Sequence, residues 1–289
     1  MPKAGKRENS LRNAGDGYID LNLPEENSRQ LTEGAFALGY GCTAVSHRVV
    51  GRISEMDRFT PPRETLAQAG PMPAFERLLR VTSRLSWASE ENRTTERKVL
   101  SRLTFVAEDH TQTNALLEAR DVISSYDIVA IQPMTERAMM QACSVLDVDI
   151  ICIDAGQRLP FKLRPPLLKN ALDRGVHFEI CYTSALRGGS SRWNFFNNAQ
   201  ALIRATHGRN IILSSSTQIP FELRGPYDVI NLATQMGLSQ KQAKEAITKR
   251  CEAVIARAAN RKIARGGIET LPCPEGGGGG ERDTEMGGA

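Results

Sequence analysis

The stretch DIVAIQPMTERAMMQACSVLDVDIICI, residues 127–153, places an apolar run on each side of a segment of mixed character. The runs 127–132 and 149–153 are predicted to be strands. The second is continuously apolar after its first residue, as expected of a parallel strand covered on both faces. Residues 135–146 between them are predicted to be a helix with Thr135 as its N-cap. A strand, helix and strand in this order are typical of α/β proteins.

The same alternation continues on both sides of this stretch, as far as RGPYDVINL at 224–232. Further strands are predicted at 18–23, 42–46, 99–106, 177–181 and 210–213. Further helices are predicted at 25–38, 111–121, 165–172, 191–206 and 226–236, followed by a last helix capped by Ser239. Seven strand–helix units with short connections predict a TIM-barrel-like α/β fold. An open doubly wound sheet is the alternative, although no glycine-rich phosphate loop follows the first strand.

One barrel domain over residues 17–263 is expected, because a chain of 289 residues is of ordinary size for a single barrel. Residues 1–16 are expected to form a disordered basic tail. Residues 264–289 are expected to form a disordered Gly-rich tail, since they contain little that could form a core. Residues 57–98 mix prolines with charges of both signs, and they are predicted to be an insertion with one short helix near 74–79.

Basic residues are unevenly distributed along the chain, whose net charge is +4. Residues 156–192 contain seven Lys or Arg and two acidic residues, and residues 241–265 contain eight and two. Each segment is therefore more positive than the whole chain, which favours a polyanionic partner at particular faces. The alternative is that both segments are ordinary solvated helix faces and loops.

The sequence also suggests where the protein resides. No apolar run reaches the roughly 18 residues of a membrane span, and residues 1–13 lack the apolar core of a secretory signal. The six cysteines form no C-x-x-C pair. Cys152 and Cys181 lie in strand-like runs and are expected to be buried thiols in a reducing compartment.

No constellation of catalytic or metal-binding residues is apparent. None of the four histidines belongs to an H-x-H or H-E-x-x-H pattern. His177 opens an apolar strand and is expected to be structural. Asp20 and Glu179 could face the barrel interior and pair with an arginine there, and acid/base catalysis by one of them stays open. The sequence therefore predicts no metal site.

Arginine, serine and glycine are found where a barrel enzyme would carry its chemistry, at the ends of the strands. Arg187 and Arg192 flank the loop GGSS at 188–191, which precedes the N-terminus of a helix, and such a terminus attracts anions. Trp193, Phe195 and Phe196 could stack on RNA bases, but their helical spacing favours packing in the core.

Several segments together resemble a known family: SRLTFV (101–106), YDIVAIQPMTE (126–136), ACSVLDVDIICI (142–153), LPFKLRPPLLKNALDRGVHFEICYTSAL (159–186) and NIILSSSTQIPFELRGPYDVINLATQMGLS (210–239). In order and spacing they are similar to the thirty-kilodalton protein subunit of ribonuclease P and ribonuclease MRP, found in archaea and eukaryotes. The resemblance extends from about residue 18 to 261 and is weakest over 57–97. DRG at 173–175, SS at 214–215 and RGPYD at 224–228 are its most specific motifs.

The resemblance implies a barrel related to the polymerase-and-histidinol-phosphatase superfamily, without the metal-binding histidines of that superfamily. It implies a non-catalytic subunit of a ribonucleoprotein that removes the 5′ leader of precursor tRNA or, in ribonuclease MRP, processes pre-rRNA. The RNA of that particle holds Mg²⁺ and performs the chemistry, so no cofactor bound by the protein is expected.

The implied partners are the ribonuclease P or MRP RNA, precursor tRNA indirectly, a small ferredoxin-like subunit, other protein subunits and a second copy of this chain. The implied location is the nucleus and nucleolus of a eukaryote, or otherwise the cytoplasm. Two alternatives remain open. One is a metal-dependent phosphoesterase of the same superfamily, and the other is a barrel that binds proteins and never RNA.

Contacts with RNA phosphates are expected from the basic and hydroxyl residues of the loops and strand ends. The candidates are His47, Arg48, Arg102, Arg158, Lys162, Arg164, Arg174, Arg187, Arg192, Ser214, Ser215 and Arg224. His47 is equally interpretable as an ordinary surface residue. For Arg224 the favoured interpretation is an internal ion pair with Asp228 or Asp173, with a phosphate contact as the alternative.

Overall fold

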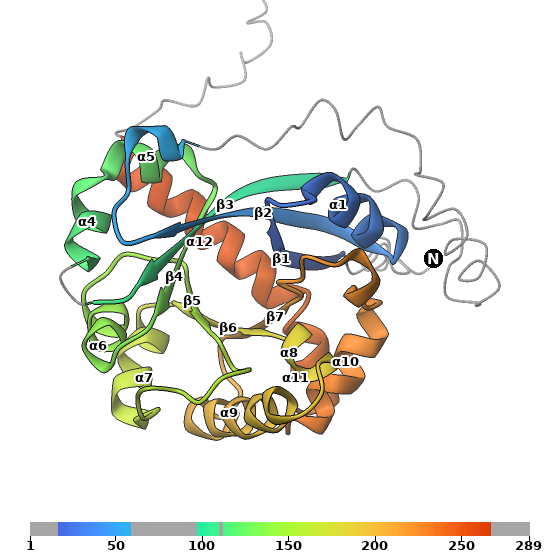
Figure 1. Ribbon diagram of the computed structural model, residues 1–289. Helices are drawn as coiled ribbons and strands as arrows, with labels where there is room; N and C mark the ends of the chain where they lie inside the picture. The colour runs from blue at the N-terminus through green and yellow to red at the C-terminus, as the bar shows by residue number, and fades with distance from the viewer. Residues whose placement is uncertain (1–16, 59–96, 110–111, 267–289) are drawn as a thin grey trace, which may run out of the picture.

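The computed structural model describes residues 17–58, 97–109 and 112–266 (Figure 1). Seven parallel strands form one sheet in which each strand pairs with the next along the chain. The strands are β1 (Tyr18–Pro24), β2 (Tyr40–Val50), β3 (Lys98–Ala107), β4 (Ile128–Pro133), β5 (Ile150–Ile153), β6 (His177–Cys181) and β7 (Ile211–Ser214). The predicted tail 1–16 and the predicted helix near 74–79 lie outside the described residues. Of the predicted tail 264–289, residues 264–266 are the end of a helix instead, and the rest lies outside the described residues.

Helices follow the strands around the outside of the sheet (Figure 1). They are α1 (Ser28–Ala37), η1 (Glu55–Asp57), α4 (Thr113–Glu118), α5 (Arg120–Ser125), α6 (Glu136–Ser144), α7 (Pro165–Asp173), α8 (Thr183–Leu186), α9 (Ser190–Thr206), η3 (Pro220–Glu222), α10 (Pro226–Gln235), α11 (Gln240–Glu245) and α12 (Lys249–Gly266). In the described part of the chain, no helix is long and apolar enough to cross a membrane.

The predicted alternation of strands and helices is confirmed, and the differences have local causes. Thr135 caps α6 as predicted, since its hydroxyl accepts the Ala138 N–H at 3.3 Å. The predicted helix 111–121 is two short helices, α4 and α5. The predicted last helix is also two helices, because the one that Ser239 caps ends at Glu245 and α12 begins at Lys249. Strand β2 is longer than the predicted 42–46, because it pairs with β3 as far as Val50.

The sheet curves into a nearly closed barrel, and the chain between α11 and α12 fills the seam between β7 and β1. The Leu213 N–H of β7 donates to Ala246 O at 3.2 Å, and the Ile19 N–H of β1 donates to Ile247 O at 2.9 Å. Further along the seam, the Ser216 N–H donates to Asn22 O at 2.9 Å. The fold is therefore the predicted TIM-barrel-like one, and the open-sheet alternative is wrong.

Helix α12 covers the N-terminal end of the barrel and lies across the ring of strands in Figure 1. Cys251, Val254 and Ala258 on one of its faces are buried against inward-facing apolar side chains such as Ile128 and Ile150, the first residues of β4 and β5. These residues recur at helical spacing, so one face of the helix is apolar and packs on the core.

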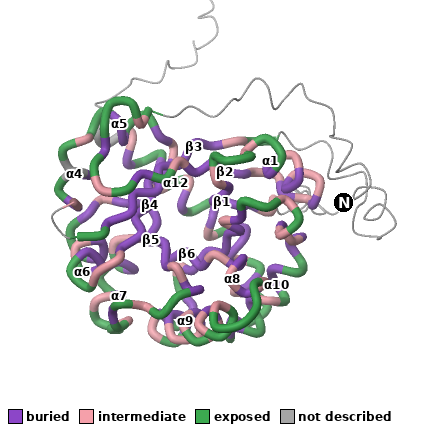
Figure 2. The backbone as a smooth tube through the Cα atoms, in the orientation of Figure 1, coloured by how far each residue is buried: buried purple, intermediate pink, exposed green. Residues whose placement is uncertain are grey.

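Ion pairs fasten the same helix to the starts of two strands. Arg261 contacts the carboxylate of Asp149, which is buried, at 3.0 Å. Lys262 contacts the carboxylate of Asp127, which is partly exposed, at 2.9 Å. Asp149 and Asp127 directly precede β5 and β4. Figure 2 shows the strands as the buried centre of the molecule, with exposed residues on the surrounding helices and loops.

Candidate functional site

The barrel interior toward the C-terminal ends of the strands is polar, and an ion pair between opposite strands occupies it. Arg102 of β3 and Glu179 of β6 have side chains with 0% exposure. The guanidinium donates in bidentate fashion, from Nη1 to Oε1 at 2.5 Å and from Nη2 to Oε2 at 2.6 Å. The expectation that Glu179 faces the interior and pairs with an arginine is confirmed.

The remaining hydrogen-bonding groups of this pair also have partners. Arg102 donates to Leu21 O at 2.8 Å and to Thr104 Oγ1 at 2.9 Å. Glu179 accepts from Ser214 Oγ at 2.7 Å and from Asn22 Nδ2 at 3.1 Å. Burial raises the pKa of Glu179, but the Arg102 guanidinium and these hydrogen bonds outweigh it, so the net pKa lies below its ordinary value. Glu179 is therefore ionised at neutral pH.

Asp20 of β1 lies next to this pair and ties β1 to the residues that follow β7. Its carboxylate accepts the Ser215 N–H at 3.2 Å and the Asn22 N–H at 3.1 Å. Burial raises the pKa of Asp20 to about 6, with a smaller contribution from the nearby charge of Glu179. A general acid or base must reach its substrate. Asp20 is 1% exposed and Glu179 is 0% exposed, so neither is accessible to a substrate in this structure.

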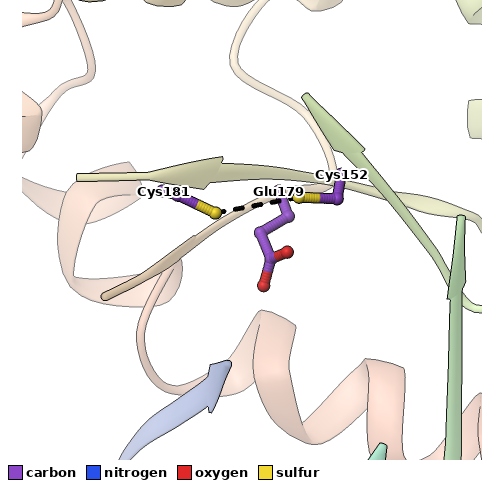
Figure 3. A group of neighbouring side chains, drawn as sticks. All are labelled: Cys152, Glu179 and Cys181. Carbon is purple, nitrogen blue, oxygen red and sulfur yellow. Dashed lines mark hydrogen bonds between the residues drawn. The ribbon is translucent and has the colours of Figure 1, made fainter. Parts of the chain in front are cut away.

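Three potential metal ligands, Cys152, Glu179 and Cys181, converge in the same region (Figure 3). The two sulfur atoms are 3.7 Å apart. The hydrogen bond with Cys181 and burial raise the pKa of the Cys152 thiol well above its ordinary value, so this thiol is protonated. Both carboxylate oxygens of Glu179 already bind a guanidinium, which would repel a metal cation. The geometry fits a pair of thiols beside an ion pair better than it fits a metal centre.

Three of the predicted RNA contacts belong to this buried centre. Arg102, Ser214 and Ser215 are at most 1% exposed, and their polar atoms bond to Glu179 or to the backbone of β1. Their prediction as RNA contacts is corrected on this ground. Asn22 is a member of the centre that sequence reasoning missed, although its place two residues after Asp20 on a strand gives both side chains the same face.

Arg174 and His177 also have structural environments. Arg174 donates to the carbonyls of Ala142, Cys143 and Leu146 and so satisfies the C-terminal end of α6. His177 is buried as predicted, and burial lowers its pKa to about 4.

The exposed candidates divide into two groups. His47 and Arg48 lie on β2, where His47 Nδ1 is 2.6 Å from Glu25 Oε2 and the Arg48 side chain is exposed. The other group lies in the loop after β5 and around α8 and α9. It consists of Arg158, Lys162, Arg164, Arg187 and Arg192.

Close packing brings this second group together. Asn198 of α9 donates to Ala155 O at 3.0 Å and to Gln157 O at 2.7 Å, so the loop after β5 lies against α9. A Cβ atom on Gly156 would lie 3.0 Å from Ser191 Oγ, which shows how closely the loop approaches the start of α9. These basic side chains follow strand ends, where barrel proteins bind their ligands.

The predicted ion pair of Arg224 with Asp228 or Asp173 is wrong. Arg224 Nη1 donates instead to Phe221 O at 2.9 Å and to Leu223 O at 3.1 Å. Asp173 ends α7, at the opposite end of the barrel from the segment after β7. Arg224 still has a structural contact on its backbone, since its N–H donates to the buried Tyr182 hydroxyl at 3.1 Å.

A pocket of about 310 Å³ opens beside Arg224, lined also by Tyr182, Leu186 and Leu232. Two large side chains near this region are exposed, Phe221 at 82% and Trp193 at 71%. Core packing is confirmed for Phe195, which is 0% exposed and forms an edge-to-face pair with Phe196. For Trp193 the prediction of core packing is wrong.

These features define a TIM-barrel-like protein whose interior holds an ion pair and whose rim carries a group of exposed basic residues. A family model described as RNase P subunit p30 matches residues 17–263, and the chain belongs to this family. The ribonuclease P protein subunit p30 of Mus musculus is 35% identical over 261 residues, covering 89% of this chain and 91% of the mouse protein.

Two further comparisons agree. A probable ribonuclease P protein subunit 3 of Schizosaccharomyces pombe is 42% identical over 165 residues, covering 57% of this chain and 69% of that protein. A chain in a structure of archaeal ribonuclease P with mature tRNA has the same fold, with a TM-score of 0.60 at 15% identity. The match covers 90% of this chain and 100% of the archaeal one.

We expect Arg102→Met to reduce the free energy of unfolding by about 3–5 kcal/mol, because it leaves the Glu179 carboxylate buried and unpaired. The double variant Arg102→Met/Glu179→Met should be more stable than Arg102→Met, because it removes both charges. Urea unfolding followed by circular dichroism measures both values, with the exposed Arg209→Met as control. The single variant Glu179→Met completes the comparison. If the effects of Arg102→Met and Glu179→Met sum to that of the double variant within about 0.5 kcal/mol, the two residues are uncoupled.

The free energy of unfolding of Asp20→Asn, measured relative to that of the wild type, should increase as pH rises. The folded state raises the pKa of Asp20 from 3.8 to about 6. Its contribution to stability is therefore complete below pH 4 and is lost as pH rises through 6. Between pH 5 and 8 the difference between variant and wild type should change by about 1.4 kcal/mol.

The experiment compares Asp20→Asn with the wild type because His177 also titrates in this pH range. The pKa of His177 is lowered in the folded state, so its contribution to stability increases as pH rises and would mask that of Asp20 in the wild type alone. Asp121→Asn, at an exposed position, provides the control. A difference between Asp20→Asn and wild type that stays constant from pH 5 to 8 would contradict the raised pKa.

Proposed function

We propose that this chain is a non-catalytic protein subunit of ribonuclease P that binds and stabilises the RNA responsible for removing the 5′ leader of precursor tRNA. One observation carries the proposal: in a member of this family, the Arg102–Glu179 pair fills the place of an active centre, while exposed arginines gather at the rim. The protein would thus supply binding surface, and the RNA would supply the chemistry and hold the Mg²⁺.

Phosphate neutralisation is the physical basis of the proposed role. A folded RNA carries dense negative charge, which side chains of Arg and Lys bind without reading the bases. Arg164 is 64% exposed and lies 2.9 Å from Glu136, and Arg187 is 56% exposed and lies 3.8 Å from Glu222. Exposed ion pairs of this kind contribute little energy, so an RNA phosphate can replace the carboxylate.

The proposed partners are the ribonuclease P RNA, a small ferredoxin-like subunit, other protein subunits of the complex and a second copy of this chain. Membership of ribonuclease MRP and a nuclear, nucleolar location belong to the same proposal. The names of the mouse and fission yeast relatives support membership of ribonuclease P. The binding of precursor tRNA is proposed to be indirect, through the particle.

The alternative of a metal-dependent phosphoesterase requires a histidine–carboxylate cluster. In the described part of the chain, the potential ligands that converge are Cys152, Glu179 and Cys181, and Glu179 is already occupied by Arg102. The alternative of a barrel that binds proteins and never RNA makes a different prediction, since such a barrel would show no salt-sensitive binding of RNA.

A particle purified through a tag on this chain should contain the ribonuclease P RNA and should remove the 5′ leader of precursor tRNA in Mg²⁺. Digestion of the RNA with a calcium-dependent nuclease, stopped by chelation of Ca²⁺, should abolish cleavage. The purified chain should not cleave precursor tRNA, because its interior carboxylates are inaccessible. Accurate cleavage by the purified chain that Asp20→Ala or Glu179→Ala abolishes would make the protein the catalyst. Recovery of the MRP RNA tests membership of the second particle.

Replacement of Arg164, Arg187 and Arg192 together by alanine should weaken RNA binding by the purified chain and flatten its salt dependence. Each lost phosphate contact lowers the slope of log K against log salt by about one unit. The matched control replaces three exposed basic residues of a different surface by alanine. They are Arg204 in the last turn of α9, Arg209 just after α9 and Lys241 in α11. An equal slope for both triple variants would place the RNA-binding face elsewhere.

A further inference from the structure

We propose that Trp193 and Phe221 form a stacking site for unpaired nucleotides of RNA, with Arg158, Arg187 and Arg192 binding the phosphates that flank the stacked bases. This inference rests on the proposed function and specifies the kind of RNA structure that one face of the barrel recognises.

The first argument is the exposure of the two rings. Trp193 is 71% exposed and Phe221 is 82% exposed, although aromatic side chains of this size contribute strongly to stability when buried. Neighbouring Phe195, two residues after Trp193, is buried at 0% exposure. The start of α9 therefore supplies one ring to the core and presents another to the outside.

Both rings are carried by rigid backbone. Trp193 lies in the first turns of α9, a helix of 17 residues. Phe221 lies in η3, where Arg224 donates to the Phe221 carbonyl at 2.9 Å and the Glu222 N–H donates to Ile219 O at 2.9 Å. Ordering of these segments on binding thus costs little, which favours affinity.

Hydrogen bonds and an ion pair connect the segments of the two rings through α8. Arg187, which follows α8, is 3.8 Å from Glu222 beside Phe221. Arg192, beside Trp193, donates from Nε to Ala185 O at 2.9 Å and from Nη2 to Leu186 O at 3.3 Å. In Figure 1 α8 lies beside α10, the helix that follows the segment of Phe221, and residues of both helices line the same pocket.

The charge of this surface favours RNA. Arg187 contacts Glu222 beside Phe221, Arg192 adjoins Trp193 in the sequence, and exposed Arg158 lies in the loop that packs against α9. Of the neighbouring carboxylates, Glu222 already accepts from Thr217 Oγ1 at 2.7 Å, and Asp228 lies on the pocket wall with Arg224. The surface around the rings thus combines Arg158, Arg187, Arg192 and Arg224 with the carboxylates of Glu222 and Asp228.

Aromatic rings beside guanidinium groups suit single-stranded RNA, because the rings stack on bases and the guanidinium groups bind phosphates. Here an arginine adjoins Trp193 in sequence and another contacts the segment of Phe221. Bases splayed from a loop or bulge stack on such rings, whereas a duplex offers no free base face.

The fluorescence of Trp193 tests the proposal directly. The sequence has two tryptophans, so Trp87→Phe leaves Trp193 as the single one. Titration of the full chain with single-stranded oligouridylate should quench this fluorescence, and a duplex of the same length should quench it much less. Trp193→Ala and Phe221→Ala should each weaken single-strand binding about fivefold or more, with the salt slope unchanged, since phosphate contacts remain.

Conservative and matched variants complete the test. Trp193→Phe and Phe221→Tyr keep an aromatic ring and should retain most of the affinity. Met140→Ala and Val145→Ala remove exposed apolar side chains of a different surface, on and just after α6, and should have no effect. Equal losses from these controls and from the aromatic variants would overturn the proposal.

The outcomes separate the stacking site from the function on which it rests. Salt-dependent RNA binding that the alanine variants leave intact would refute the stacking site and leave the proposed function standing. Absence of RNA from the purified particle would refute both. If Trp193→Ala/Phe221→Ala keeps its affinity for single-stranded RNA but no longer co-purifies with the protein subunits, the face is a protein-docking surface and the stacking site is rejected.

Discussion

The ion pair between Arg102 and Glu179 is the constraint on which the barrel interior depends. It joins β3 to β6 through the centre of the fold, with both side chains fully buried. Desolvation of two charges offsets most of their attraction, so the pair adds little net stability by itself. The pair instead favours this arrangement of the strands over others, because an arrangement that leaves one of the two charges buried and unpaired costs about 3–5 kcal/mol. Thr104, Ser214 and Asn22 satisfy the remaining groups, and these side chains therefore have to face inward from β3, β7 and β1.

This interior determines where function can lie. A barrel enzyme opens its interior to a substrate at the C-terminal ends of the strands. Here the interior is closed at one end by α12, and the polar layer toward the other end is saturated with internal hydrogen bonds. The loops and short helices that follow β5, β6 and β7 remain available for recognition. These segments carry the exposed arginines and the exposed rings of Trp193 and Phe221.

Sequence patterns predicted the parts of the fold that depend on local periodicity. Strand β6 coincides with the predicted range 177–181, and Thr135 caps α6 as expected. The seam between β7 and β1 could not be predicted, because it depends on two carbonyls of an irregular segment, those of Ala246 and Ile247. Arg102 was misassigned for a similar reason. A single arginine in a strand gives no sign of whether its partner is a phosphate or a carboxylate on a distant strand.

The exposed residues show a related limit. Helical spacing distinguished buried Phe195 correctly but not Trp193, since the start of a helix protrudes beyond the core that its later turns cover. Phe221 was missed because its segment, between β7 and α10, has neither helical nor strand periodicity. Arg224 acts there through backbone carbonyls, and the hydroxyls of Tyr40 and Tyr182 bond to its own backbone at 3.1 Å each. The segment around Arg224 is therefore held by contacts to main-chain atoms. Such contacts leave no pattern of paired side chains in the sequence.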